Sequence, residues 1–286
     1  MKHLITSFRL TAVGLLIVQA VSGQGKAIKD ITSTERCTIR NDWKNYFESC
    51  LCDGAVVIYD AIGNHWILSD TVGTKVEVLP ASTFKIINLL IALETGTIAD
   101  ENEVVKWPGS TDTVKYGYRP DIYHDMSVKE AFQVSAGWVF VELAKKIGKE
   151  TYKKYLTQCH YGNLDLSNKD DDFWNFGAFG ISPINQVSFV KNLYYENLPF
   201  RTRNMQIVKK VMLTESQENY TISAKTGWTR DKGINTGWWV GFLENKEGVY
   251  FFATRLLQDR KINSTNFGSC RKDITKAILK NLEIIE

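Results

Sequence analysis

Stretches of apolar residues predict strands near both ends of the chain and helices between them. Asp53–Asp60 contains a continuous apolar run, which is typical of a buried strand, and His65–Leu68 is expected to pair with it as a hairpin. Phe84–Leu93 is almost entirely apolar and is followed by Glu94-Thr95-Gly96. Because a surface helix would show a polar face, this pattern predicts a buried helix that ends at the glycine.

Capping residues mark further helices in the middle of the chain. Ser127-Val128-Lys129-Glu130 is a capping box that predicts a helix start. Val139–Ile147 is a second helical segment, and Gly148 ends it. Ser182-Pro183 supplies an N-cap and a first-turn proline for a helix that runs to Tyr195.

The last third of the chain returns to strand patterns. Tyr220–Ala224, Gly237–Leu243 and Val249–Leu256 are strand-like, and Glu244–Gly248 predicts a hairpin between the latter two. Arg271–Ile284 has apolar residues at helical spacing and predicts a terminal helix.

This order of elements predicts an α/β fold of the α+β type. We expect strands from both ends to share one antiparallel sheet flanked by helices, and residues of about 85–190 to form a mainly helical lobe. No linker, repeat or low-complexity tract divides residues 24–286, so we expect one domain.

Residues 1–23 resemble a secretory leader. Lys2 and Arg9 flank the start, Leu10–Val21 is apolar, and Val21-Ser22-Gly23 offers a cleavage site. The alternative, a membrane anchor, is disfavoured because the apolar run is short for a bilayer span. We therefore expect an exported, periplasmic protein without a stable membrane anchor.

Charge and cysteine content narrow the function classes. The formal net charge is +3 and falls once the leader is removed, so the sequence gives no electrostatic reason to expect nucleic acid as a partner. The histidines are scattered and lack ligand spacing, so we expect no metal site. An odd number of cysteines allows at most two disulfides, with the pairing open, among Cys37, Cys50, Cys52, Cys159 and Cys270.

Pro80–Lys85 contains the first candidate for chemistry. A serine hydroxyl needs a base to become a nucleophile, and the i, i+3 spacing allows Lys85 to lie against the Ser82 oxygen. The same spacing occurs at Ser188/Lys191 and Ser269/Lys272, but only Ser82 opens an apolar helix in which a lysine would be buried. The alternative is a capping serine beside a lysine that extends to solvent.

Three later motifs follow in the chain. Lys225-Thr226-Gly227 is placed at a strand end, where its side chains can bind an anion and its glycine allows close approach, although a solvated strand end has the same pattern. Ser135-Ala136-Gly137 and Tyr161-Gly162-Asn163 offer hydroxyl and amide groups for a proton relay or a polar substrate, although each is commonly a turn.

In this order the motifs resemble class D (oxacillinase-type) serine β-lactamases, from about Trp43 to Ile284. Ser-x-x-Lys together with Lys-Thr-Gly is typical of β-lactamases and penicillin-binding proteins. Class A would require a general-base glutamate that we cannot place, and class C chains are longer and lack the Phe-Trp pair. The resemblance also covers Leu93–Gly96, Lys106-Trp107, Gln133–Ala136, Phe173-Trp174 and Trp238–Gly241.

The resemblance implies a β-lactamase/transpeptidase-like fold and four catalytic residues. Ser82 would be the nucleophile, and Lys85, carboxylated on its amine by CO2 to N6-carboxylysine, would be the general base. The indole N–H of Trp174 would hold the carbamate, and Ser135 would pass a proton to the lactam nitrogen. CO2 or bicarbonate is the only cofactor implied.

The resemblance also implies how a small-molecule β-lactam would be held. Backbone N–H groups of Ser82 and Trp228 would form the oxyanion hole, and Lys225, Thr226 and Arg271 would bind the substrate carboxylate. Gly227, Tyr161 and Asn163 complete the expected substrate-binding set.

Gly137 departs from the family, which usually has valine at this position. A glycine leaves space for water beside the lysine, so we predict weaker carboxylation and a stronger dependence on bicarbonate. Phe176, Phe179 and Gly180 are also unusual, and they are candidates to refill this space.

Other functions share these motifs. A penicillin-binding sensor would be acylated but hardly released, and a transpeptidase or carboxypeptidase would act on D-Ala-D-Ala peptides. Both are usually anchored by membrane helices, for which no segment after the leader is long enough. The sequence leaves the substrate spectrum, which we expect to depend on loops such as Thr229–Thr236, and the choice between monomer and homodimer open.

Overall fold

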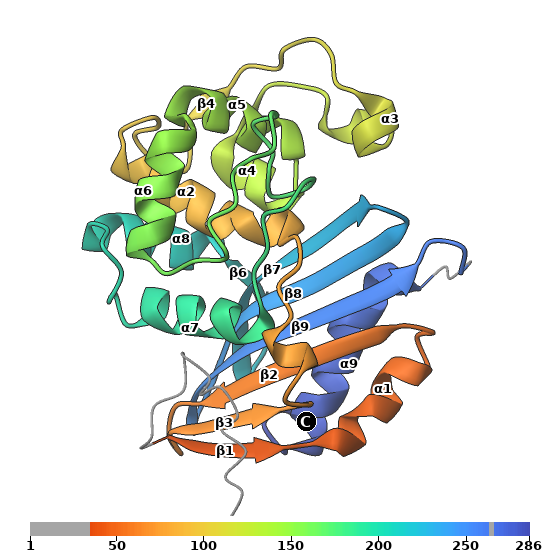
Figure 1. The fold of residues 1–286 in the computed structure, drawn as a ribbon. Helices are drawn as coiled ribbons and strands as arrows, with labels where there is room; N and C mark the ends of the chain where they lie inside the picture. Colours follow the sequence, from red (N-terminus) through yellow and green to blue (C-terminus); the bar gives the residue numbers. More distant parts are fainter. Residues whose placement is uncertain (1–34, 263–265) are drawn as a thin grey trace, which may run out of the picture.

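A seven-stranded sheet built from both ends of the chain lies at the centre of the structure (Figure 1). The computed structural model describes residues 35–262 and 266–286. The strand order is β1-β3-β2-β9-β8-β7-β6, and all neighbours are antiparallel except β1, which runs parallel to β3. The prediction of a shared antiparallel sheet is confirmed. The strands are β1 (Arg36–Ile39), β2 (Asp53–Asp60), β3 (His65–Leu68), β6 (Leu213–Ser216), β7 (Tyr220–Asp231), β8 (Ile234–Asn245) and β9 (Gly248–Asp259).

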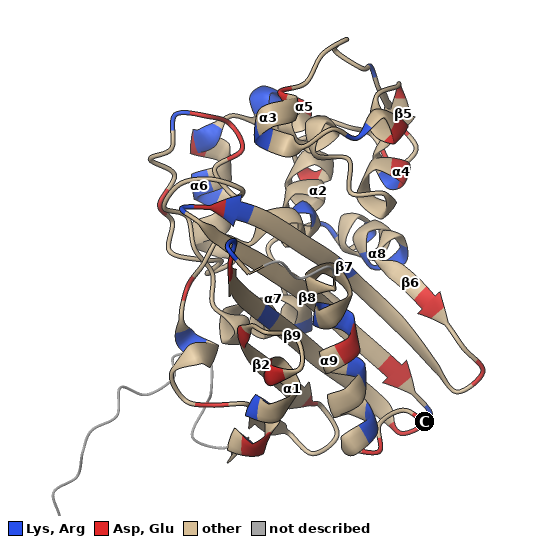
Figure 2. Cartoon of the chain, turned by 90° about the vertical axis from the view of Figure 1, so that its right-hand side faces the viewer, with Lys and Arg blue, Asp and Glu red and all other residues tan. Residues whose placement is uncertain are grey.

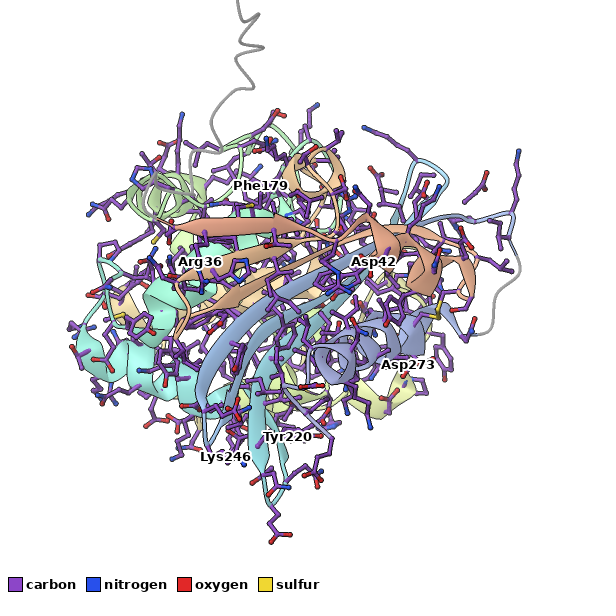
Figure 3. All side chains as sticks on the ribbon, turned by 90° about the horizontal axis from the view of Figure 1, so that it is seen from below. Arg36, Asp42, Phe179, Tyr220, Lys246 and Asp273 are labelled. Carbon is purple, nitrogen blue, oxygen red and sulfur yellow. A yellow bond between two sulfur atoms is a disulfide. The ribbon has the colours of Figure 1, made fainter. Side chains whose placement is uncertain are left out.

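Helices cover both faces of this sheet, which explains the continuous apolar runs in its central strands. On β8, Trp238 and Val240 face the core shared with the helical lobe, whereas Trp239 and Leu243 face the other core. Helix α7 (Pro183–Tyr194) packs on the first face. Helix α9 (Phe267–Asn281) and α1 (Lys44–Glu48) cover the second, and Figure 3 shows α9, which carries Asp273, against that face.

The remaining helices form a lobe above one end of the sheet (Figure 1). Every residue of α2 from Lys85 to Leu93 is buried, as its apolar sequence predicts. The predicted caps are present, because Ser127 accepts from the Glu130 N–H and Ser182 from the Asn185 N–H, both at 3.2 Å. The lobe comprises α2 (Lys85–Glu94), α3 (Thr113–Tyr116), α4 (Val128–Gln133), α5 (Gly137–Ile147), α6 (Lys149–Gln158), α8 (Thr202–Val211) and a small sheet of β4 (Val104–Val105) with β5 (Met126–Ser127).

Single-turn 3₁₀ helices connect several elements. They are η1 (Asn41–Trp43), η2 (Gly73–Lys75), η3 (Ala81–Phe84) and η4 (Pro120–Ile122). Of these, η3 leads directly into α2 and carries Ser82.

The prediction that β7 ends at Ala224 is wrong. The strand continues to Asp231, so Lys225-Thr226-Gly227 lies in its middle, and Thr229–Thr236 is a paired hairpin rather than a free loop. The strand can continue through these polar and glycine residues because β8 pairs with them throughout, as in Gly227 with Trp238.

One disulfide joins the two ends of the described chain. Cys50 and Cys270 are bonded across a sequence separation of 220 residues and link the end of α1 to α9. Cys37, Cys52 and Cys159 are free thiols. Cys50 lies in the turn after α1, and Cys52 lies just before β2.

The sequence also led to predictions about the leader, membrane-spanning segments and surface charge. The predicted leader, residues 1–23, lies outside the described residues. Within the described ranges, no helix combines the length and apolar character that crossing a bilayer requires. Basic and acidic positions are scattered over both lobes in Figure 2, in agreement with the low net charge.

Candidate active site

Ser82 and Lys85 meet where η3 becomes α2. Lys85 Nζ donates a hydrogen bond to Ser82 Oγ over 2.8 Å. The turn is held from two sides, because the Ala81 N–H donates to the Trp174 carbonyl over 3.0 Å and Thr83 Oγ1 donates to the Pro80 carbonyl over 2.7 Å. Ala81 has a φ of +52°, a conformation that such a fixed turn must stabilise. The serine oxygen and the lysine nitrogen are therefore preorganised.

Lys85 is buried without a counter-ion. Its residue is 1% exposed, and its Nζ lies 5.1 Å from the centre of the Phe140 ring on α5. No carboxylate of the described residues lies within ion-pair distance of it. Burial disfavours the charged form and lowers the pKa of Lys85 to about 7. Near neutral pH a large share of this amine is uncharged and able to act as a nucleophile or base.

Trp174 packs against the residue that precedes Lys85 and has an unsatisfied donor. Its indole stacks on Phe84, the residue before Lys85, with ring centres 4.8 Å apart and planes 7° apart. Its Nε1 is buried and has no hydrogen-bond acceptor among the described residues. Since a buried N–H without an acceptor is costly, the position is suited to an added anionic acceptor.

Gly227 allows β7 to approach the serine turn closely. A Cβ at this position would lie 2.8 Å from the Pro80 carbonyl oxygen and 3.3 Å from the Ser82 backbone nitrogen. Any side chain here would push the strand away from the turn. The glycine of the Lys-Thr-Gly motif is thus required by backbone contact.

Lys225 and Ser135 join the sheet to the helical lobe. Lys225 Nζ donates to Ser135 Oγ and to the Thr226 carbonyl, each over 3.0 Å. Ser135 has a φ of +62°, which turns its hydroxyl toward the strand at the start of α5. Lys225 is 4% exposed, and burial followed by the nearby charges of Lys85 and Arg271 holds its pKa well below the usual range.

Arg271 and Trp228 form the side of the site that faces α9. Arg271 Nη1 donates to the Gly227 carbonyl, and its guanidinium lies 5.9 Å from the Trp228 ring centre. Burial lowers the pKa of Arg271 to about 10, which still leaves it charged at neutral pH. Trp228 is 40% exposed and forms part of the rim. Arg271 gives this side a positive charge, and Lys225 adds a buried nitrogen whose charged form an arriving anion would stabilise.

Tyr161 and Asn163 require a correction, because the structure does not bring them to this site. Tyr161 has no exposed surface, and its hydroxyl lies 3.4 Å from Gln186 Oε1. The Asn163 amide donates to the Ala178 carbonyl over 2.9 Å and its oxygen accepts from the Gly180 N–H. The Asn163 side chain therefore shapes the loop that follows Trp174, and burial against α7 removes the Tyr161 hydroxyl from contact with a substrate.

The space beside Gly137 is open. A Cβ there would meet no atom within 4 Å, so neither aromatic residue of the Trp174 loop refills it. Phe179 instead packs on Phe84 at 5.7 Å, and Phe176 packs on Tyr116 at 5.9 Å. The suggestion that they compensate for the missing side chain is therefore wrong.

Sequence reasoning did not find the roles of Phe140, whose ring faces the Lys85 nitrogen, and Phe84, whose ring stacks on Trp174. Phe84 lies next to Lys85 in the sequence, and Phe140 follows Gly137 of the Ser-Ala-Gly motif by one helical turn. These local positions are the only hints of those roles. Elsewhere, the described residues contain no cluster of side chains suited to hold a metal ion.

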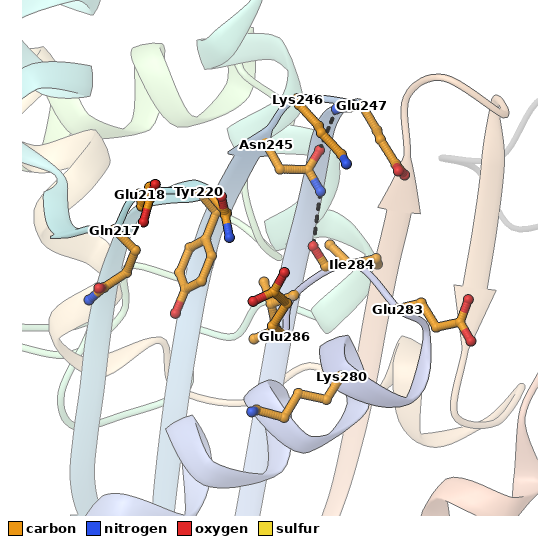
Figure 4. A pocket seen from close by; sticks show the side chains of 12 residues that line it. Gln217, Glu218, Tyr220, Asn245, Lys246, Glu247, Lys280, Glu283, Ile284 and Glu286 are labelled. Carbon is orange, nitrogen blue, oxygen red and sulfur yellow. Dashed lines mark hydrogen bonds between the residues drawn. The ribbon is translucent and has the colours of Figure 1, made fainter.

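A separate groove of about 690 Å³ lies at the opposite end of β7 (Figure 4). It runs between the turn at Tyr220, the β8–β9 turn at Lys246 and the C-terminal residues Ile284 and Glu286. The Asn245 amide crosses it to donate to the Ile284 carbonyl over 2.9 Å. It holds none of the motif residues and is rich in carboxylates, so it is not suited to an anionic substrate.

The fold and the site together define the class of protein. Residues 70–280 match the family described as the penicillin binding protein transpeptidase domain. The match includes the Ser82–Lys85 turn, the Ser135 loop, the Trp174 loop and Lys225-Thr226-Gly227.

Individual relatives narrow the class to one family. β-Lactamase OXA-48 of Klebsiella pneumoniae is 35% identical over 243 residues, covering 85% of this chain and 88% of that protein, and OXA-10 of Pseudomonas aeruginosa is 34% identical over 251 residues, covering 87% and 91%. The class D β-lactamase structure from Sebaldella termitidis is 37% identical with a TM-score of 0.81, over 88% of this chain and all of that one. FUS-1 (OXA-85) from Fusobacterium nucleatum subsp. polymorphum is 29% identical with a TM-score of 0.79, over 87% and 100%. The chain belongs to the class D β-lactamases.

Proposed function

We propose that this protein hydrolyses the β-lactam ring of penicillin-type antibiotics through an acyl-enzyme on Ser82, with N-carboxylated Lys85 as the general base. The observation that carries the proposal is the buried Lys85 amine, which lies 2.8 Å from Ser82 Oγ and has no counter-ion among the described residues. Loss of the ring would inactivate the antibiotic and confer resistance.

The residues around Lys85 fit a carbamate. The neutral amine forms an N–C bond with CO2 and releases one proton, and the resulting anion supplies a base that a protonated lysine cannot provide. The buried indole N–H of Trp174 has no acceptor among the described residues and is the natural donor for this anion.

Ser82 then attacks the lactam carbonyl carbon as its proton passes to the base. The backbone N–H groups of Ser82 and Trp228 stabilise the oxyanion, and each such donor contributes about 3 kcal/mol in comparable enzymes. Ser135 passes a proton to the lactam nitrogen as the C–N bond breaks, and Lys225, 3.0 Å from its hydroxyl, favours this transfer electrostatically.

Water completes the cycle. The base removes a proton from water, the oxygen attacks the ester carbonyl, and Ser82 Oγ leaves with a proton, giving a ring-opened product with a new carboxyl group. Lys225, Thr226 and Arg271 hold the carboxylate already present on the substrate, and Gly227 keeps this strand against the serine turn.

We also infer export to the periplasm. The leader-like residues 1–23 support it, and so does the Cys50–Cys270 disulfide, because such bonds persist in oxidising compartments. Monomer and homodimer both remain compatible with this function, and the molar mass in solution distinguishes them.

A slowly released acyl-enzyme, as in a penicillin-binding sensor, is the alternative. The open space beside Gly137 favours it, since water there would weaken the base needed for deacylation. A burst of product followed by no turnover would identify this function.

The test is a time course of benzylpenicillin hydrolysis with and without bicarbonate, for the wild type and Ser82→Ala. We expect continuous turnover by the wild type, a faster rate with bicarbonate, and neither turnover nor a covalent adduct by mass spectrometry for Ser82→Ala. Equal melting temperatures would show that the variant is folded. Turnover by Ser82→Ala, or a wild-type rate indifferent to the removal of CO2, would contradict the mechanism.

A further inference from the structure

Asp172 is a buried carboxylate for which the proposed reaction has no use. It lies two residues before Trp174, and its side chain is 1% exposed. Lys115 Nζ lies 3.1 Å from Asp172 Oδ1, and the Tyr116 hydroxyl donates to Oδ2. A carboxylate so well removed from water requires such partners, so Asp172 is held firmly by two residues 56 and 57 positions earlier in the chain.

The same two residues also reach the far side of Trp174. Lys115 Nζ lies 4.7 Å above the Phe176 ring, and the Tyr116 ring packs edge-on against Phe176 at 5.9 Å. Lys115 and Tyr116 therefore contact the chain two residues before and two residues after Trp174. We call Lys115, Tyr116 and Asp172 the α3 clasp.

Helix α3 has little else to hold it in place. It is a single turn, Thr113–Tyr116, in which no residue is buried, and Val114 is 97% exposed. Asp112 caps it by accepting from the N–H groups of Val114 and Lys115, which fixes the direction of the turn. Because no residue of α3 is buried, contacts of Lys115 and Tyr116 with Asp170, Asp172 and Phe176 link this turn to the Trp174 loop, and Asp172 is the buried partner among them.

The backbone next to Asp172 transmits this hold to the site. The Asn175 N–H donates to the Asp172 carbonyl over 2.9 Å, and Thr229 on β7 donates to the Asn175 carbonyl over 2.6 Å. Between them, the Trp174 carbonyl accepts from the Ala81 N–H. The loop is thus fixed at three points, on α3, on the serine turn and on β7, and the indole that it carries stacks on Phe84.

We propose that the α3 clasp positions the Trp174 indole N–H beside Lys85 and thereby determines how strongly Lys85 retains CO2. The inference rests on the proposed function, because it concerns the carbamate of that mechanism. Lys115, Tyr116 and Asp172 are positioning residues and touch neither substrate nor the reacting atoms.

Asp172→Asn tests the clasp, since it keeps the shape of the side chain and removes its charge. We expect the bicarbonate concentration for half-maximal benzylpenicillin turnover to rise roughly 3- to 30-fold, the range in which remote substitutions alter coupling between sites. Saturating bicarbonate should restore kcat, and the carbamate signal of ¹³C-bicarbonate-loaded enzyme should weaken in NMR spectra at low bicarbonate.

Asp170→Asn is the matched control. Asp170 binds the same Lys115 nitrogen at 2.8 Å, but its side chain is 61% exposed, and the Tyr116 hydroxyl donates to Asp172 instead. We expect its half-maximal bicarbonate concentration to match that of the wild type. Tyr116→Phe removes one hydrogen bond while keeping the ring on Phe176, so it carries the same test if Asp172→Asn does not fold.

The outcomes separate the two proposals. A wild type without a carbamate signal and without bicarbonate dependence would overturn the proposed function, and the clasp with it. A wild type with both, beside clasp variants with unchanged bicarbonate dependence, would overturn the clasp alone. A lower melting temperature with unchanged bicarbonate dependence would also overturn it, because it would show a structural role only.

Discussion

Two buried lysines lie in one site, and their surroundings differ. Lys85 faces the Phe140 ring and has Ser82 Oγ as its hydrogen-bond partner. Lys225 contacts polar oxygens of Ser135 and Thr226 and lies close to other cations. Burial lowers the pKa of both, but for Lys225 the charges of Lys85, Arg271 and Lys272 lower it further.

The different surroundings explain how two lysines can have two roles in one site. An apolar pocket yields a neutral amine that can react, which suits Lys85 for carboxylation. A lysine among cations gains most when an anion arrives, which suits Lys225 for the substrate carboxylate. The surroundings of each lysine, and not the residue type, therefore determine its function.

Among the variants considered, Lys85→Met should have the largest effect on benzylpenicillin turnover. Removing the base should lower benzylpenicillin turnover about 100- to 10,000-fold, the usual contribution of general-base catalysis. Added bicarbonate should not rescue it. Mass spectrometry should find any acyl-enzyme that does form to be long-lived, and rapid release of product by this variant would contradict the assignment.

The pH profile of benzylpenicillin turnover should report the protonation of Lys85. With a pKa of about 7, Lys85 is increasingly protonated below pH 7, and a protonated amine cannot take up CO2. Turnover at low bicarbonate should therefore fall about tenfold per pH unit below 7, and saturating bicarbonate should move this limb to lower pH. A limb that does not respond to bicarbonate would assign it to another group.

Arg271→Ala should raise KM with little change in kcat, whereas Lys225→Gln should raise KM and also lower kcat, because Lys225 assists proton transfer from Ser135. Each removes a charged partner of the substrate carboxylate, and a hydrogen bond to a charged group is worth about 1.5–3 kcal/mol, or roughly 10- to 100-fold. Lys272→Gln is the control, because it removes a nearby positive charge whose Nζ lies by the Trp239 ring at 5.7 Å. Equal changes in KM for all three would indicate long-range charge alone.

Gly137→Val should have the smallest effect and in the opposite direction. Gly137 lies one turn before Phe140 on α5, and a Cβ there meets open space, so the side chain can be added without strain. We expect the added methyl groups to exclude water from beside the lysine and so to lower the bicarbonate requirement modestly. Titration with bicarbonate measures it, and Gly137→Ala should lie between the two.

The sequence was informative where contacts are local. The Ser82–Lys85 pair follows from one helical turn, and the buried strand Asp53–Asp60 follows from its apolar run. Strand β7 was cut short because Lys225-Thr226-Gly227 has the composition of a strand end. What extends it is pairing with β8 and the close approach to Ala81, both of which come from distant parts of the chain.

The remaining features depend on contacts that no local pattern contains. Tyr161 looked available to substrate because its hydroxyl and the neighbouring asparagine are polar, but Phe84 and Phe189 enclose its ring. Two further contacts join segments far apart in the sequence. They are the hydrogen bond from Tyr116 to Asp172 and the disulfide between Cys50 and Cys270. Such contacts require the assembled fold.

The central pairing of β2 with β9 also has a consequence for biosynthesis. Asp53 pairs with Leu257, and Cys50 with Cys270 across 220 residues, so the early strand finds its neighbour only when translation is almost complete. At common ribosome speeds this delay is roughly 10–40 s. The central sheet therefore cannot be completed until synthesis is almost finished, whatever the helical lobe does before then.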